Sequence, residues 1–237
     1  MKTFGLLLAL LVTEIAFCQS GKKLFKTIGG KAVFEVADKN LYIFESGMMI
    51  DADGAPKAYH KDNRMALDFL ANAGKPGNWW ALVTDTGKRD GQPVTQSSGD
   101  PAPGYYISMT SLANGAKKTT DPSRYVNSSG VPYIAIPPKF SASFKLGDIA
   151  LVVNKKNGKR CYAIFADTGP ANKIGEGSVF LAEKLGIVSN PKRGGTDKKV
   201  VYILFKKSGT GKVLSNEEIE SKGKARLSDA EIEDLIK

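Results

Sequence analysis

The chain has 237 residues, of which 42% are hydrophobic and 24% are charged, so it falls in the ordinary globular range and has enough apolar residues for one well-buried domain. Its formal net charge of +10 would suit nucleic acid, acidic lipid or anionic wall polymers. The lysines are scattered in pairs, however, and no nucleic-acid-binding motif accompanies them, so we expect no nucleic-acid partner.

Residues 1–20 have the pattern of a secretory signal peptide, with a lysine followed by an apolar run. The run from Phe4 to Val12 is about half of the ~20 residues that a membrane-spanning helix needs. We therefore expect an extracellular or periplasmic protein that does not touch a membrane after cleavage. Residues 21–237 are predicted to form a single domain that acts as a monomer, with a short helical tail at about 214–237.

The sequence holds few residues for thiol or metal chemistry. Loss of the signal peptide would remove Cys18 and leave Cys161 alone, so the mature chain can form no internal disulfide. Cys161 lies in an apolar run typical of a buried strand. His60 is the single histidine, which leaves no second histidine for a metal site, and no metal is predicted.

Short apolar stretches between turn residues predict a mainly β protein. Two strands joined by a turn are expected within residues 24–49, and further strands at 79–84, 104–109, 133–136, 148–154, 161–166 and 200–205. Asn157-Gly158 stands between the strands predicted at 148–154 and 161–166. This dipeptide is a hairpin signal, so residues 148–167 are expected to form an antiparallel pair. The glycine-rich segment 51–104 reads mostly as loops, with one short helix around 65–71.

Three further segments are predicted to be helical. One begins after Ser178 and ends at Gly186, and two lie in the tail. Ser215 with Glu218, and Ser228 with Glu231, fit the capping box at a helix start. Many short strands with turn signals between them, and few helices, favour a barrel or a sandwich.

The segment YAIFADTGPANKIGEGS, residues 162–178, holds the candidate catalytic residues Asp167 and Glu176. Asp167 ends an apolar strand, where desolvation raises the pKa of a carboxyl. Glu176 precedes a predicted helix start, which favours its ionised form. These surroundings suggest Asp167 as the acid and Glu176 as the base of a glycosidase pair, in either the inverting or the retaining spacing. Both residues could instead cap turns.

Candidate substrate-binding residues come from two other stretches. In MMIDADGAPKAYH, Asp51 and Asp53 point the same way on an extended segment and could bind the ammonium of an amino sugar or stabilise the turn at Gly54. The later positions of that stretch exclude a calcium-binding EF-hand. Sugar rings stack on exposed aromatic faces. The remaining candidates for substrate binding are Tyr59, His60, Trp79 and Tyr105.

Together with ANAGKPGNWW, DPAPGYYISMTSL, DPSRYV and VPYIAIP, these stretches resemble the fungal-type chitosanases of glycoside hydrolase family 75, over about residues 44–205. The resemblance implies an endo-acting enzyme that hydrolyses the β-1,4 bonds of chitosan with inversion and needs no cofactor. It also implies that Asp167 corresponds to the essential aspartate of that family and Glu176 to its essential glutamate.

The D-T-G turn is also similar to that of double-psi barrels, which implies a six-stranded barrel of this type with long loops. Chitosan is a polycation, so a basic enzyme needs a locally acidic cleft, for which Asp51, Asp53, Asp167, Glu176, Asp62, Asp68 and Asp85 are candidates. A peptidoglycan- or chitin-active wall enzyme and a non-catalytic polysaccharide-binding barrel are the alternatives.

Overall fold

The computed structural model describes residues 21–237, and the predicted signal peptide lies outside the described residues. Six strands close into a ring: β3 (Leu41–Asp51), β10 (Thr196–Phe205), β7 (Ile149–Asn154), β8 (Arg160–Thr168), β6 (Tyr133–Ile136) and β9 (Glu176–Ser178). The last strand, β9, pairs in parallel with the end of β3 and so completes the barrel. This confirms the predicted mainly β fold with a six-stranded barrel.

A hairpin of β1 (Lys22–Ile28) and β2 (Lys31–Val36) extends the sheet beside β3. The short 3-10 helix η1 (Ala37–Lys39) turns the chain from β2 into β3. The predicted hairpin around Asn157-Gly158 is confirmed as the antiparallel pair β7 and β8. The sequence prediction missed β1 and β9, which are exposed or very short and lack a clear alternating pattern.

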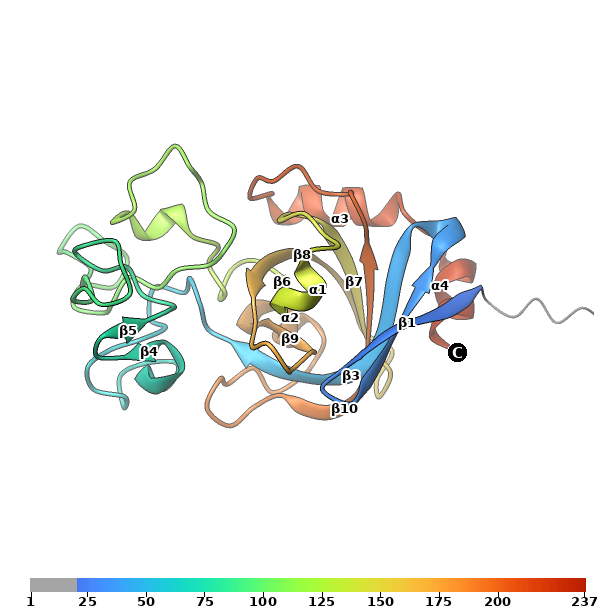
Figure 1. Cartoon of the computed structure of the whole chain (residues 1–237), viewed down its shortest axis with the longest axis horizontal. Coiled ribbons are helices and arrows are strands. Elements are labelled where there is room, and N and C mark those ends of the chain that lie inside the picture. Colours follow the sequence, from blue (N-terminus) through green and yellow to red (C-terminus); the bar gives the residue numbers. More distant parts are fainter. Residues whose placement is uncertain (1–20) are drawn as a thin grey trace, which may run out of the picture.

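The barrel is packed on both faces. Its interior is filled by alternate strand residues together with Phe140 of α1 (Pro138–Ser141) and Leu181 of α2 (Val179–Lys184). On the outside of the barrel lie α3 (Asn216–Lys224) and α4 (Asp229–Ile236) (Figure 1). They pack through Ile219 and Ile232. Both predicted capping boxes and the Ser178 cap of α2 are confirmed. None of the helices in residues 21–237 is long and apolar enough to cross a membrane.

Residues 52–132, between β3 and β6, form a lobe beside the barrel with little regular structure (Figure 1). Its elements are η2 (Leu70–Asn72), β4 (Gly74–Lys75), β5 (Asn78–Trp79) and η3 (Pro122–Arg124). Of the strands predicted at 79–84 and 104–109, only Trp79 lies in a strand, β5. The rest of this prediction is wrong, because the other residues make only single bridges such as Leu82 to Ser108. The predicted helix at 65–71 is likewise reduced to η2. Apolar residues there pack into two small local clusters instead of a sheet.

Candidate active site

A cleft of roughly 1140 Å³ runs between the lobe and the outer face of the barrel. The lobe contributes Tyr59, Trp80 and Arg89 to its lining, and the barrel contributes Met49 and the loop that follows β8. Carboxylates dominate the charged groups of the lining, with Arg89 and Lys173 as its basic side chains. The acidic members are Asp51, Asp53, Asp68, Asp167, Glu176 and Asp197.

Asp167 and Glu176 face each other across one residue of the barrel, Ala135 on β6. Ala135 is the register partner of Asp167 on β8 and, on its other side, of Glu176 on β9. Residues paired across neighbouring strands project their side chains to the same face. The two acids therefore stand on either side of a small methyl group, on the outer face of the barrel and inside the cleft.

A β-bulge turns Asp167 toward this face. Along β8, Ala163 and Phe165 point into the barrel, and strict alternation would send Asp167 inward as well. The register shifts between Ile134 and Ala135 of β6, so that Ala166 is the extra residue and Asp167 moves opposite Ala135. Bulges re-aim side chains in this way next to active sites.

The Asp167 carboxylate is held by three hydrogen bonds to one oxygen. Its Oδ1 accepts from the backbone N–H of Ser111 at 3.0 Å, from the Ser111 hydroxyl at 2.7 Å and from the Thr168 N–H at 2.7 Å. Burial raises the pKa of Asp167 to about 6, although these donors favour the ionised form and oppose the rise. None of the hydrogen bonds described for residues 21–237 involves the other oxygen, Oδ2.

Glu176 is placed differently. None of the hydrogen bonds described for residues 21–237 involves its carboxylate, which lies against Gly169: a Cβ on that glycine would sit 2.5 Å from Oε2. Burial, and then the neighbouring charge of Asp167, raise the pKa of Glu176 to about 7. Both members of the facing pair thus hold a proton to higher pH than an exposed carboxyl does.

Asp51 and Asp53 lie beside this pair at the end of β3. The Asp53 carboxylate accepts from the Tyr59 hydroxyl at 2.7 Å and from Ser108 at 3.2 Å, and Asp51 accepts from the Asp53 N–H at 2.8 Å. Burial raises the pKa of both aspartates well above the usual value, and neighbouring carboxylates add to the shift. Ligand oxygens of Asp51, Asp53 and Asp167 lie within 4.8 Å of one another, a set that could hold a hard cation or an ammonium group.

The structure brings some of the predicted substrate-binding residues to the cleft and leaves others out. Asp51, Asp53 and Tyr59 line it. Trp79 is buried in the lobe core, whereas its neighbour Trp80 lines the cleft and is 45% exposed. His60 and Tyr105 contact each other, with ring centroids 5.0 Å apart, and do not line the cleft. The sequence could not decide which of two adjacent tryptophans points outward.

The acidic cleft also differs in detail from the expectation. Asp68 lines it, as expected, but Asp62 pairs with Arg64 and Asp85 accepts the Gln92 N–H, both outside the cleft. Sequence reasoning missed Ser111, whose contact with Asp167 joins residues 56 positions apart in the chain. The turn-like segment around Ser111 carries no local signal for that role.

Cys161 is a partly buried residue of β8, as predicted for a strand cysteine. Burial raises the pKa of its thiol to about 12. Because the thiolate is the reactive form, this cysteine is inert at neutral pH.

The outer cleft of the barrel thus holds two facing, buried carboxyls whose pKa values are both raised, an arrangement that acid-base hydrolysis of a glycosidic bond can use. The family model of fungal chitosanase of glycosyl hydrolase group 75 matches residues 82–235. The chain therefore belongs to this family of chitosanases. Asp167 and Glu176 lie within the matched segment, and Asp51 and Asp53 precede it. No curated protein matches the chain.

Proposed function

We propose that this chitosanase is a secreted, monomeric enzyme that cleaves the β-1,4 bonds of chitosan within the chain and with inversion, using Asp167 and Glu176 as its acid-base pair. The placement of the two acids on either side of Ala135 is the observation that carries the proposal. Both side chains project from the same face of the barrel into the same cleft, and the small residue Ala135 lies between them.

The strand spacing supports inversion. Asp167 and Glu176 are separated by two strand-to-strand steps, which puts their Cα atoms about 9.5 Å apart. Side chains that project in parallel from such positions leave their carboxyls within the ~6.5–9.5 Å that inverting enzymes use, and wider than the ~5–5.5 Å of retaining ones. The space above the Ala135 methyl would hold the water that attacks.

The hydrogen bonds favour roles opposite to those suggested by the sequence alone. Glu176, without donors on its carboxylate, holds the proton and gives it to the glycosidic oxygen as that bond breaks. Asp167, with three donors on Oδ1, stays ionised and takes a proton from the attacking water through Oδ2. The water oxygen bonds to the anomeric carbon, and the enzyme ends with the proton on Asp167.

The acidic lining supports chitosan as the substrate over an anionic wall polymer. Carboxylates surround the pair although the whole chain has a net charge of +10, so the cleft attracts a polycation that the rest of the surface would repel. Asp51 and Asp53 would bind the ammonium of a sugar next to the scissile bond. The exposed face of Trp80 would stack on a sugar ring.

Hydrolysis of highly deacetylated chitosan tests the proposal directly. We expect rapid loss of chain length, as endo action requires, and α-anomers as the first products seen by proton NMR, because inversion converts the β bond. β-Anomers appearing first would contradict inversion. Cleavage of peptidoglycan with no cleavage of chitosan would overturn the proposed substrate.

The pH dependence tests whether two carboxyls, one protonated and one ionised, carry the reaction. Activity needs one acid protonated and the other ionised, with pKa values of about 6 for Asp167 and about 7 for Glu176. As pH falls through the lower value the base is lost, and as pH rises through the upper value the acid is lost. For short, soluble glucosamine oligomers, kcat/KM should therefore be bell-shaped with a maximum between these values. A profile that still rises below about pH 5 would contradict the need for an ionised carboxyl with a pKa near 6.

A further inference from the structure

The middle of the lobe, residues 55–107, is held to the rest of the molecule by few polar contacts. Its apolar residues pack into a cluster made of lobe residues alone. Of the hydrogen bonds described for residues 21–237, two join residues 55–107 to a part of the chain outside the lobe, and Lys192 donates both. The lobe is otherwise held at its ends, as by the hydrogen bonds of Ser111 to Asp167. The lobe is therefore a separate packing unit with one polar contact across its free side.

Lys192 stands on the loop of residues 185–195 between α2 and β10, which reaches toward the lobe (Figure 1). Its Nζ donates to the backbone carbonyls of Asn63 and Ala66, the latter at 2.6 Å, and lies 5.3 Å from the centroid of the Phe69 ring. None of the ion pairs in the described part of the chain includes Lys192. Since both acceptors are neutral carbonyls, water can replace them when the contact opens.

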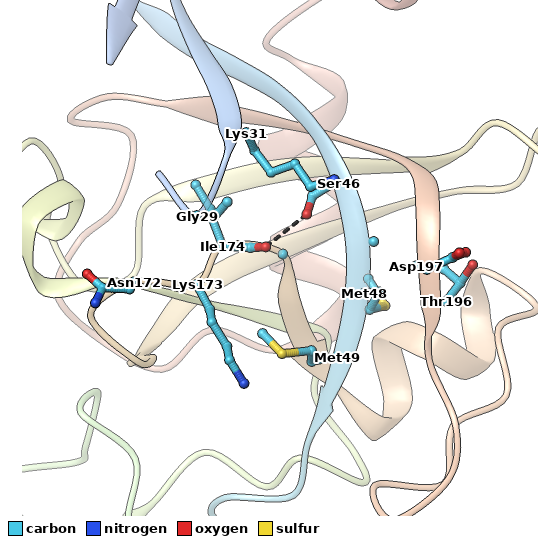
Figure 2. A pocket seen from close by; sticks show the side chains of 12 residues that line it. Gly29, Lys31, Ser46, Met48, Met49, Asn172, Lys173, Ile174, Thr196 and Asp197 are labelled. Atoms are coloured by element: carbon cyan, nitrogen blue, oxygen red, sulfur yellow. Dashed lines mark hydrogen bonds between the residues drawn. The ribbon is translucent and has the colours of Figure 1, made fainter. Parts of the chain in front are cut away.

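The loop that carries Lys192 is folded on itself and fixed to β3. The N–H of Gly195 donates to the Val188 carbonyl at 2.7 Å. Gly195 has a φ of 86°, and a Cβ there would lie 2.3 Å from the Met48 carbonyl oxygen, so glycine allows the loop to end this close to β3. Figure 2 shows the base of the loop, where Thr196 of β10 lies beside Met48. The loop is fixed relative to the barrel, so the lobe is the part that moves when the contact opens.

The acid pair lies between the ends of the lobe and the Lys192 contact. Glu176 is level with Met49 of β3, between Asp51, after which the lobe begins, and Met48, where the loop is fixed. Residues from both boundaries line the cleft: Asp53 and Ser111 at the ends of the lobe, and Pro191 and Gly194 beside Lys192. A polymer over the acid pair is thus enclosed by a covalent connection on one side and by the Lys192 contact on the other.

We propose that Lys192 determines the length of substrate that the cleft accepts, because its contact with Asn63, Ala66 and Phe69 is a latch that opens for a long chain. A short oligomer enters the latched cleft by its end and contacts both walls, including the exposed face of Trp80. A long chain that is cut in its interior enters from the side, which needs the lobe to move away from the loop. The fraction of unlatched protein then limits the rate for the polymer and not for the oligomer. This inference rests on the proposed endo-acting chitosanase activity and adds a length preference to it.

Lys192→Met tests the latch, because methionine keeps an unbranched apolar stem and removes the ammonium that bonds to the lobe. We expect the ratio of kcat/KM for polymeric chitosan to kcat/KM for a short glucosamine oligomer to rise about tenfold, as for loss of one hydrogen bond to a charged group. Lys192→Arg keeps the donors and should keep the wild-type ratio. So should the matched control Lys118→Met, an exposed loop position outside the cleft. A Lys192→Met ratio equal to or below that of wild type would overturn the inference.

A reversible cross-link tests the same movement at constant charge. The double variant Met65→Cys with Lys192→Cys places one thiol on each side of the contact, and Met65 is 54% exposed. Burial raises the pKa of the Cys161 thiol to about 12, so Cys161 does not compete for the reagent at neutral pH. Joined by a bismaleimide with a cleavable disulfide spacer, the protein should lose at least about tenfold in rate on the polymer, keep its rate on the oligomer, and recover after reduction. Equal loss on both substrates, or no loss on the polymer, would contradict the latch.

Failure of this inference can be told from failure of the proposed activity. Wild-type protein that hydrolyses neither polymer nor oligomer would overturn both. Active enzyme whose length preference is the same in wild type, in Lys192→Met and in the cross-linked protein would overturn the latch alone and leave the proposed activity standing.

Discussion

Replacing either acid of the facing pair is expected to abolish hydrolysis while the protein stays folded. Asp167→Asn keeps the oxygen that accepts from Ser111 and Thr168 but can no longer take up a proton as a carboxylate does. Glu176→Gln keeps the shape beside Gly169 and removes the acid. General acid-base groups contribute about 10²–10⁴-fold to rate, so each variant should lose at least about a hundredfold in kcat. The measurement is chitosan hydrolysis followed by reducing ends.

Thermal unfolding and a third variant provide the controls. Both substitutions remove a carboxylate that is costly to bury, so at pH 8 neither variant should melt below wild type. Asp90→Asn, an exposed acid outside the cleft, should keep full activity. A folded Asp167→Asn or Glu176→Gln enzyme with full activity would remove that residue from the mechanism.

Gly169→Ala should reduce the activity strongly although it replaces neither acid. Gly169 has no positive φ, so its backbone accepts alanine, but the new Cβ would lie 2.5 Å from Oε2 of Glu176. The flexible end of Glu176 can move away, and the acid then leaves its position above Ala135. Misplacement of a reacting group by about 1 Å can cost about 10²-fold in rate. We expect kcat to fall by at least about tenfold, with the melting temperature close to that of wild type.

Gly99→Ala is the matched control, since a Cβ there meets nothing within 4 Å and the backbone again has no positive φ. Its activity should equal that of wild type. The double variant Gly169→Ala with Glu176→Gln should be no slower than Glu176→Gln alone, because both act on one group. Further loss in the double variant would show that Gly169 acts through something other than Glu176.

The barrel could be predicted because its strands carry local signals. The strand at Tyr133–Ile136 and the hairpin around Asn157-Gly158 follow from apolar runs and turn residues, and the tail helices follow from their capping boxes. The lobe could not be predicted in the same way. Its apolar residues occur in short runs that look like strands, yet they pack into small clusters under irregular loops, an arrangement set by contacts distant in sequence.

The two candidate acids could be found in the sequence, but the position of one side chain relative to the other could not be predicted. Their nine-residue separation fits many geometries. Asp167 lies opposite Ala135 because of a bulge of one residue on the β8 side, which no local pattern indicates. The roles also depended on tertiary contacts, because the donors to Asp167 include Ser111, far away in the chain. A helix start near Glu176 suggested the base, whereas its lack of hydrogen-bond donors favours the acid.

The ring of the barrel closes at β9, a strand of three residues that pairs with both β3 and β6. Glu176 is the first residue of that strand, so the strand that closes the barrel also carries one half of the proposed acid pair. A molecule in which β9 did not pair with β3 and β6 would retain most of its sheet and yet lack the facing pair of acids.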